Sequence, residues 1–120
     1  MINRNIILAA TALVVSLASP MMTTLSAQDV QHVDVTASKF KFSPAEATVK
    51  VGQPVEIDLK SADVAHGLRL SDFNASAKAA KGETAKLTFT PDKTGDFTGH
   101  CSVFCGSGHG SMTFVLHVVK

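Results

Sequence analysis

The sequence of 120 residues lacks several features that define common classes of protein. Only two cysteines are present, Cys101 and Cys105, and because neither lies near the start, lipid attachment at a processed N-terminal cysteine is excluded. The longest apolar run is shorter than the roughly 20 residues that a transmembrane helix requires. The sequence has no nucleophile elbow, no phosphate-binding loop and no sign of a paired-carboxylate site, so an enzyme active site is not predicted.

The first 27 residues have the layout of a secretory signal peptide. A positive charge at Arg4 precedes the apolar run 6–18, and the small residue Ala27 stands just before the first acidic residue of the chain. We therefore predict a cleaved signal at residues 1–27 and export to the periplasm. Residues 28–120 then form the mature domain, with no membrane span once the signal is removed. The alternative is an uncleaved N-terminal segment that anchors the protein to a membrane.

The predicted mature domain carries no net charge. Once Arg4 leaves with the signal, ten lysines and arginines face ten aspartates and glutamates. A neutral domain has no electrostatic footprint for nucleic acid or for an anionic membrane surface, so neither is predicted as a partner. A domain this small also has a modest core, and such domains often need a disulfide or a metal ion for stability.

Apolar and polar residues alternate with a period of two along most of the predicted mature domain, which is typical of β-strands. In the last strand, four apolar residues fall on one face: Met112, Phe114, Leu116 and Val118. Turn signals such as residues 91–95 separate the short strands. We predict an all-β sandwich or barrel with most of the seven phenylalanines in the core between two sheets. The exception is residues 75–81, rich in alanine and lysine, for which we predict a short helix or a long loop.

The chemistry of the chain is concentrated in the segment CSVFCGSGHGSM, residues 101–112. Within one predicted loop it holds four soft or borderline metal ligands: Cys101, Cys105, His109 and Met112. Thiolate, imidazole and thioether ligands together suit copper, and three intervening glycines let the backbone wrap tightly enough for them to converge. His66, in an earlier predicted loop, would add an imidazole and so hold the two sheets together at one end. The other histidines are predicted to lie at the surface: His32, His100 and His117.

Three other interpretations of these residues stay open. A structural disulfide between Cys101 and Cys105 would close too small a ring to remove much loop entropy, and it leaves the histidines unexplained. Zinc could take His66, both cysteines and His109, but zinc has no use for Met112. A mononuclear type 1 copper site would need only His66, Cys105, His109 and Met112, and it leaves Cys101 unexplained.

The segment resembles the copper-binding loop of the CuA domain of cytochrome oxidase subunit II and nitrous oxide reductase. That family's loop reads Cys-x-x-x-Cys-x-x-x-His-x-x-Met, and this chain has every ligand at every spacing. The resemblance implies a cupredoxin-like Greek-key β-sandwich with a binuclear centre of two copper ions at one end. The implied ligands are the bridging thiolates of Cys101 and Cys105, the imidazoles of His66 and His109, the weak ligand Met112, and the backbone carbonyl of Val103.

The resemblance implies electron transfer rather than catalysis. In that family the protein ligates both coppers fully and leaves no open position for a substrate, in contrast to a catalytic metal site. We therefore predict an electron carrier, at most an accessory component of an oxidase or reductase, with a c-type cytochrome or a membrane oxidase as its redox partner. His109 is the predicted electron port, and Phe104 is predicted to belong to the hydrophobic shell that excludes water. The alternative is a periplasmic copper chaperone or store for oxidase assembly.

Three features depart from the oxidase subunits of this family. Val103 stands where those subunits usually carry a glutamate that serves a second metal. No pair of transmembrane helices is predicted from the residues that precede the domain, where the pattern indicates only a signal peptide. Tryptophan and tyrosine are both absent, so the aromatic electron-entry surface of the oxidase subunits has no counterpart. These departures predict a free-standing soluble relative rather than an oxidase subunit.

Overall fold

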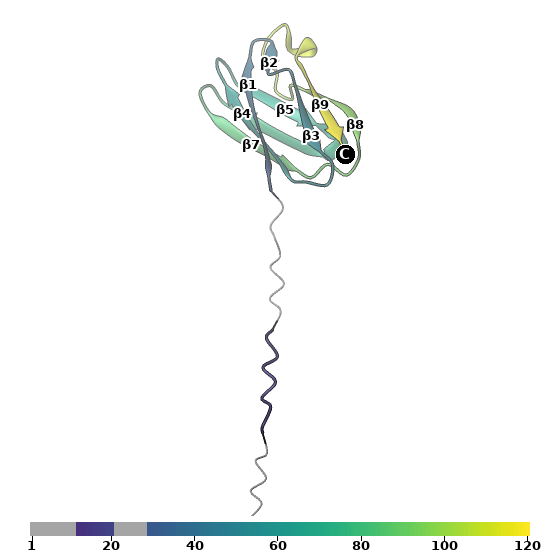
Figure 1. Cartoon of the computed structure of the whole chain (residues 1–120). Helices are drawn as coiled ribbons and strands as arrows, with labels where there is room; N and C mark the ends of the chain where they lie inside the picture. Colours follow the sequence, from purple (N-terminus) through teal and green to yellow (C-terminus); the bar gives the residue numbers. More distant parts are fainter. Residues whose placement is uncertain (1–11, 21–28) are drawn as a thin grey trace, which may run out of the picture.

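Two β-sheets pack face to face in the computed structural model, which describes residues 12–20 and 29–120 (Figure 1). The four-stranded sheet has the order β2 (Lys41–Ser43), β1 (Gln31–Ser38), β4 (Val55–Ser61) and β7 (Thr84–Phe89). The five-stranded sheet has the order β3 (Glu46–Lys50), β9 (Thr113–Val119), β8 (Gly95–His100), β5 (His66–Leu70) and β6 (Ala75–Ala79). Two short 3-10 helices, η1 (Ser71–Phe73) and η2 (His109–Ser111), interrupt the strands. The predicted β-sandwich is confirmed.

The core lies between the sheets and follows the alternation read from the sequence. In β9 and at the residue before it, the four apolar side chains predicted to share a face are all buried. Six of the seven phenylalanines lie in the core or pack against it as predicted, but only Phe42 and Phe114 are fully buried. Phe40 and three others are partly buried and pack against the core, whereas Phe104 is 79% exposed. The small aliphatic side chains of the strands fill the rest of the space between the sheets.

The segment for which a helix or loop was predicted forms strand β6 instead. It pairs antiparallel with β5, so that Ala75 lies opposite Leu70 and Ala79 opposite His66. Ala75 and Ala79 are buried, which gives the strand one face toward the core. Strand propensity depends strongly on such pairing and burial, and here these outweigh the low preference of alanine and lysine for strands.

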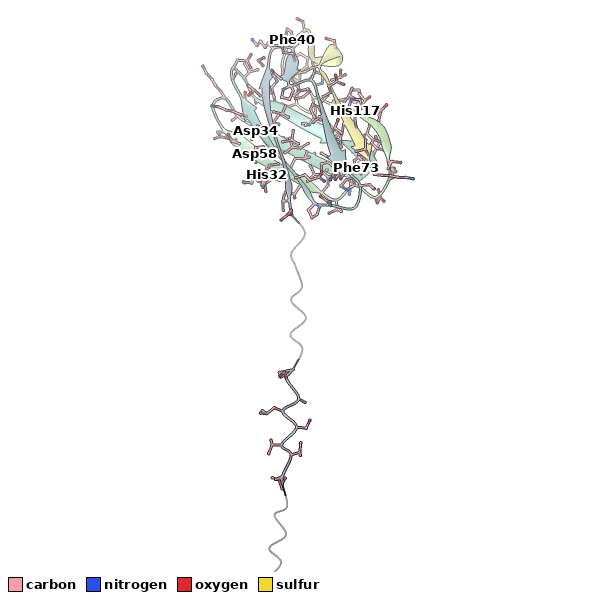
Figure 2. All side chains as sticks on the ribbon, viewed as in Figure 1. His32, Asp34, Phe40, Asp58, Phe73 and His117 are labelled. Atoms are coloured by element: carbon pink, nitrogen blue, oxygen red, sulfur yellow. The ribbon has the colours of Figure 1, made fainter. Side chains whose placement is uncertain are left out.

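All the strands that carry candidate ligands belong to the five-stranded sheet. His66 begins β5, and residues 101–112 connect β8 to β9. The expectation that these ligands hold the two sheets together is therefore wrong. The other sheet reaches the same end of the sandwich through the β1–β2 turn, where Lys39 and Phe40 lie (Figure 2).

The predicted signal peptide lies largely outside the described residues. Of residues 1–27, the structure describes only 12–20, which form neither helix nor strand. Across the described ranges 12–20 and 29–120, no helix has the length and apolar character needed to cross a membrane.

One histidine on the outer face of the five-stranded sheet joins three strands. Nδ1 of His117 on β9 lies 2.6 Å from Asp96 Oδ1 on β8, and its Nε2 lies 2.7 Å from Glu46 Oε2 on β3. Both ring nitrogens can donate only when the ring is an imidazolium. Glu46 first, and then Asp96, therefore raise the pKa of His117 above its usual range.

This arrangement predicts a specific dependence of stability on pH. Because the pKa of His117 is higher in the folded chain, its contribution is fully present below the unfolded value of about 6.5 and is lost as the pH rises through the folded value. Between about pH 6 and about pH 9, the unfolding free energy of the wild type should therefore fall more than that of His117→Gln. Urea unfolding at the two pH values measures this difference. His100→Gln, which alters an exposed histidine on β8, should retain the wild-type dependence. An identical pH dependence in His117→Gln would contradict the prediction.

Candidate metal centre

His66 is fixed in orientation by a neighbouring carboxylate. Its side chain is fully buried, and its Nε2 lies 2.6 Å from Asp63 Oδ1. A carboxylate at this distance favours the tautomer in which Nε2 carries the proton and donates it, so the lone pair of Nδ1 stays free. Nδ1 lies 4.0 Å from Cys101 Sγ. The free nitrogen of His66 is thus placed beside the first cysteine of the β8–β9 connection.

Asp63 is itself held in the ionised state by the backbone. The N–H of Lys39 donates to Asp63 Oδ2 and that of Val64 donates to Oδ1, each at 2.7 Å. The Lys39 N–H in particular, aided by the contact with His66, lowers the pKa of Asp63 to about 2. Asp63 therefore remains an acceptor for His66 at all ordinary pH values. The sequence pattern did not single out Asp63, because its role depends on a donor 24 residues away in the chain.

The two cysteines lie side by side as free thiols. Both are buried, and their Sγ atoms are 3.7 Å apart, far beyond the roughly 2.05 Å of a disulfide. Cys101 Sγ also lies 3.1 Å from the carbonyl oxygen of Val103. Cys105 Sγ lies 3.7 Å from His109 Nδ1 and 3.8 Å from the buried Met112 Sδ. Around this pair of sulfurs the structure brings together all six predicted ligands: His66, Cys101, Val103, Cys105, His109 and Met112.

The spacing of these atoms fits a metal centre. With metal bonds of about 2.0–2.3 Å to nitrogen and sulfur, neighbouring ligands of a tetrahedral ion are about 3.3–3.8 Å apart. The two Sγ atoms, His109 Nδ1 and Met112 Sδ lie 3.7–3.8 Å from a sulfur neighbour. His66, Cys101 and Cys105 form a group whose ligand atoms all lie within 4.8 Å of one another. This set of soft sulfur and imidazole donors fits copper.

Loading the site with metal requires loss of protons. Burial, reinforced by the neighbouring Cys101, raises the pKa of the Cys105 thiol above its usual range. Because a thiol must lose its proton to become a metal ligand, metal binding at this site competes with protons and is weaker at low pH.

The ring of Phe40, in the β1–β2 turn of the four-stranded sheet, supports the loop. A Cβ atom on Gly108 would lie 2.4 Å from ring atoms of Phe40, and one on Gly106 would lie 2.8 Å from the same ring. Gly106 also has a φ of 136°, a conformation that favours glycine. Glycine at these two positions therefore allows the loop to lie directly on Phe40. The sequence pattern gives no sign of this contact, because it joins segments far apart in the chain.

The outer side of the loop is more open than predicted. Phe104 is 79% exposed, so it does not form the water-excluding shell expected of it. Its ring centroid lies 5.7 Å from that of His109, which is half-buried. On the inner side of the loop, Cys101, Cys105 and Met112 belong to the buried core cluster. The remaining histidines are at the surface as predicted: His32 and His100 are exposed, and His117 is partly exposed.

Comparisons with known proteins agree with the fold. The chain belongs to the cupredoxin-like domain family, whose model matches residues 5–114. It is homologous to cytochrome c oxidase subunit 2 of Thermus thermophilus, with 31% identity over 88 residues that cover 73% of this chain. The chain spans 64% and 52% of the length of two such Thermus sequences.

Solved structures show the same fold at lower identity. The periplasmic domain of cytochrome oxidase subunit II of Bradyrhizobium japonicum superposes with a TM-score of 0.70 at 23% identity, covering 78% of this chain and 86% of that domain. Auracyanin A, a blue copper protein of Chloroflexus aurantiacus, gives a TM-score of 0.64 at 19% identity, covering 76% of this chain and all of that protein. The cupredoxin-like fold inferred from the resemblance is confirmed.

Proposed function

We propose that this protein is an electron carrier with a binuclear copper centre of the CuA type. The observation that carries the proposal is the arrangement of six donors around two thiols whose sulfur atoms are 3.7 Å apart. A single tetrahedral ion takes four ligands, whereas a binuclear centre would use all six donors. The zinc interpretation leaves Met112 and the Val103 carbonyl unused, and the type 1 interpretation leaves Cys101 and that carbonyl unused.

The residues of the site suit the movement of electrons. Copper bound here would supply a centre that gains and loses one electron. Asp63 fixes the ring of His66, and Phe40 supports the glycines of the loop, so the ligands are held in one arrangement and reorganise little. His109 is half-buried beside the exposed Phe104, at the end of the sandwich where the loop reaches the surface. We assign His109 as the electron port and this end as the contact for a redox partner, a c-type cytochrome or a membrane oxidase.

The proposal includes export, because residues 1–27 have the pattern of a signal peptide. We propose that the working protein begins at Gln28 in the periplasm and is not itself an enzyme. Intact-mass measurement of the protein recovered from the periplasmic fraction tests the cleavage site. A mass that includes residues 1–27, recovered with the membranes, would favour the uncleaved anchor.

The copper content and spectra of the reconstituted protein test the function. We expect about two coppers per chain, a purple colour, and an electron-spin signal split by two equivalent nuclei, because all six donors are used. One copper with a blue colour and splitting by a single nucleus would instead indicate a type 1 site. A colourless protein that takes up only Cu(I) would indicate a copper chaperone or store. Either the blue mononuclear result or the colourless result would overturn the proposal of a binuclear electron carrier.

A further inference from the structure

A second group of potential metal ligands lies on the outer face of the four-stranded sheet. It consists of His32 on β1 with Glu56 and Asp58 on β4, and one ligand atom of each lies within 4.8 Å of the others. Parallel pairing of β1 with β4 sets His32 opposite Glu56 and Asp34 opposite Asp58. Figure 2 shows His32, Asp34 and Asp58 together on this part of the molecule, toward the end away from Phe40 and the β8–β9 loop.

One carboxylate oxygen in this group is buried without a hydrogen-bond donor. Asp58 Oδ1 has almost no accessible surface and accepts no hydrogen bond among the described residues. The side chains of Glu56 and Asp58 are only 17% and 28% exposed. An ionised oxygen removed from water without a partner is costly, and such a group calls for a specific explanation. A bound cation would provide one.

Among the described residues, Lys86 supplies the one ammonium ion-paired with these carboxylates, and it is poorly placed to compensate for Asp58. Lys86 Nζ contacts Glu56 Oε1 but lies 3.8 Å from Asp58 Oδ1, and the Lys86 side chain is 67% exposed. Asp34 adds a further acidic residue to the same face of the paired strands. Three carboxylates thus lie near one exposed ammonium, and the excess of negative charge favours a divalent ion.

We propose that His32, Glu56 and Asp58 form a second metal site, for a divalent transition-metal ion of the Zn²⁺ type. One imidazole nitrogen and two carboxylates are ligands that Zn²⁺ uses, with water completing the tetrahedron. The group contains no thiolate, so its chemistry differs from that of the cysteine centre, where soft ligands favour Cu(I). Metal binding would displace Lys86 from Glu56 and would give Asp58 Oδ1 its missing partner. This site does not depend on the function of the cysteine centre.

Calorimetric titration of the copper-loaded full chain with Zn²⁺ near neutral pH tests the proposal. We expect one Zn²⁺ to bind while the copper spectrum stays unchanged. The Kd should rise about tenfold or more in His32→Gln and in Glu56→Gln, because each removes a ligand. Lys86→Met should lower the Kd several-fold, because it removes the competing ammonium. His100→Gln, an exposed histidine on the other sheet, is the matched control and should leave the Kd unchanged.

The histidine ring signals report the site directly. Zn²⁺ should shift the ring resonances of His32 and leave those of His100 in place, and the rest of the NMR spectrum shows that each variant is folded. The titration is repeated in the double variant Cys101→Ser/Cys105→Ser, which lacks both thiols of the cysteine centre. The same Kd for Zn²⁺ in this variant would show that the zinc is not bound at the cysteine centre. No Zn²⁺ binding by the wild type, or equal Kd values in the wild type and His32→Gln, would overturn the proposal.

Discussion

Replacement of either cysteine by serine is expected to abolish the binuclear centre, and the two variants should differ. In Cys101→Ser, Cys105 Sγ keeps His109 Nδ1 at 3.7 Å and Met112 Sδ at 3.8 Å as neighbours. Together with His66, this is the ligand set of a type 1 site, so we expect one copper per chain and a blue colour. In Cys105→Ser, the remaining thiol of Cys101 has only His66 and the Val103 carbonyl beside it, so we expect little or no Cu(II) to be retained.

The physical reason is that a serine hydroxyl is a hard, weakly acidic ligand that does not bridge two coppers as a thiolate does. Metal analysis with optical and electron-spin spectra measures the outcome. Ser107→Ala, which changes an exposed residue of the same loop, is the control and should keep both coppers. Each metal-free variant should still unfold cooperatively, at a somewhat lower temperature than the wild type, because a serine hydroxyl replaces a buried thiol of the core. Two coppers and a purple colour in Cys101→Ser would contradict the prediction.

The parts of the molecule that follow local patterns could be predicted from the sequence. The alternation in β9 fixed which of its residues face the core, since side chains of a strand point to opposite faces in turn. The spacing of the cysteines, His109 and Met112 identified the metal-binding loop, because these ligands are close in the chain and converge within one connection between two strands. Both features depend on neighbours in sequence, and the structure agrees with both.

The parts that depend on pairing between distant segments could not be predicted in this way. β6 is a strand because it pairs with β5, although its three alanines and one lysine have little preference for strands. The assignment of His66 to the same sheet as the loop follows from the strand order, which no local pattern encodes. The group formed by His32, Glu56 and Asp58 exists only because β1 and β4 pair in parallel with one particular register. In each case the deciding contact joins residues far apart in sequence.

Asp63 is a further case, and its contact with His66 makes it the most consequential residue that the sequence did not reveal. It accepts from Lys39 N–H with one oxygen and faces His66 Nε2 with the other, so one carboxylate joins the β1–β2 turn to a candidate ligand. In Asp63→Ala, the ring of the buried His66 would lose its acceptor and its fixed tautomer. Loss of such an outer partner typically costs 10–100-fold in metal affinity, and we expect a decrease of about this size for copper.

A graded series separates this orienting role from a general loss of structure. Asp63→Asn keeps an oxygen that can accept from His66, but its amide NH₂ then faces the donor N–H of Lys39, so its copper affinity should lie between those of the wild type and Asp63→Ala. Asp72→Ala, an exposed aspartate of η1, should bind copper as the wild type does. Competition with a Cu(I) chelator measures the affinities, and the ring signals of His66 report its orientation. If Asp63→Ala bound copper as tightly as the wild type, the buried position of His66 alone would be enough to orient its ring. An intermediate Asp63→Asn with a reoriented ring in Asp63→Ala would instead show that the hydrogen bond to Asp63 holds this ligand in place.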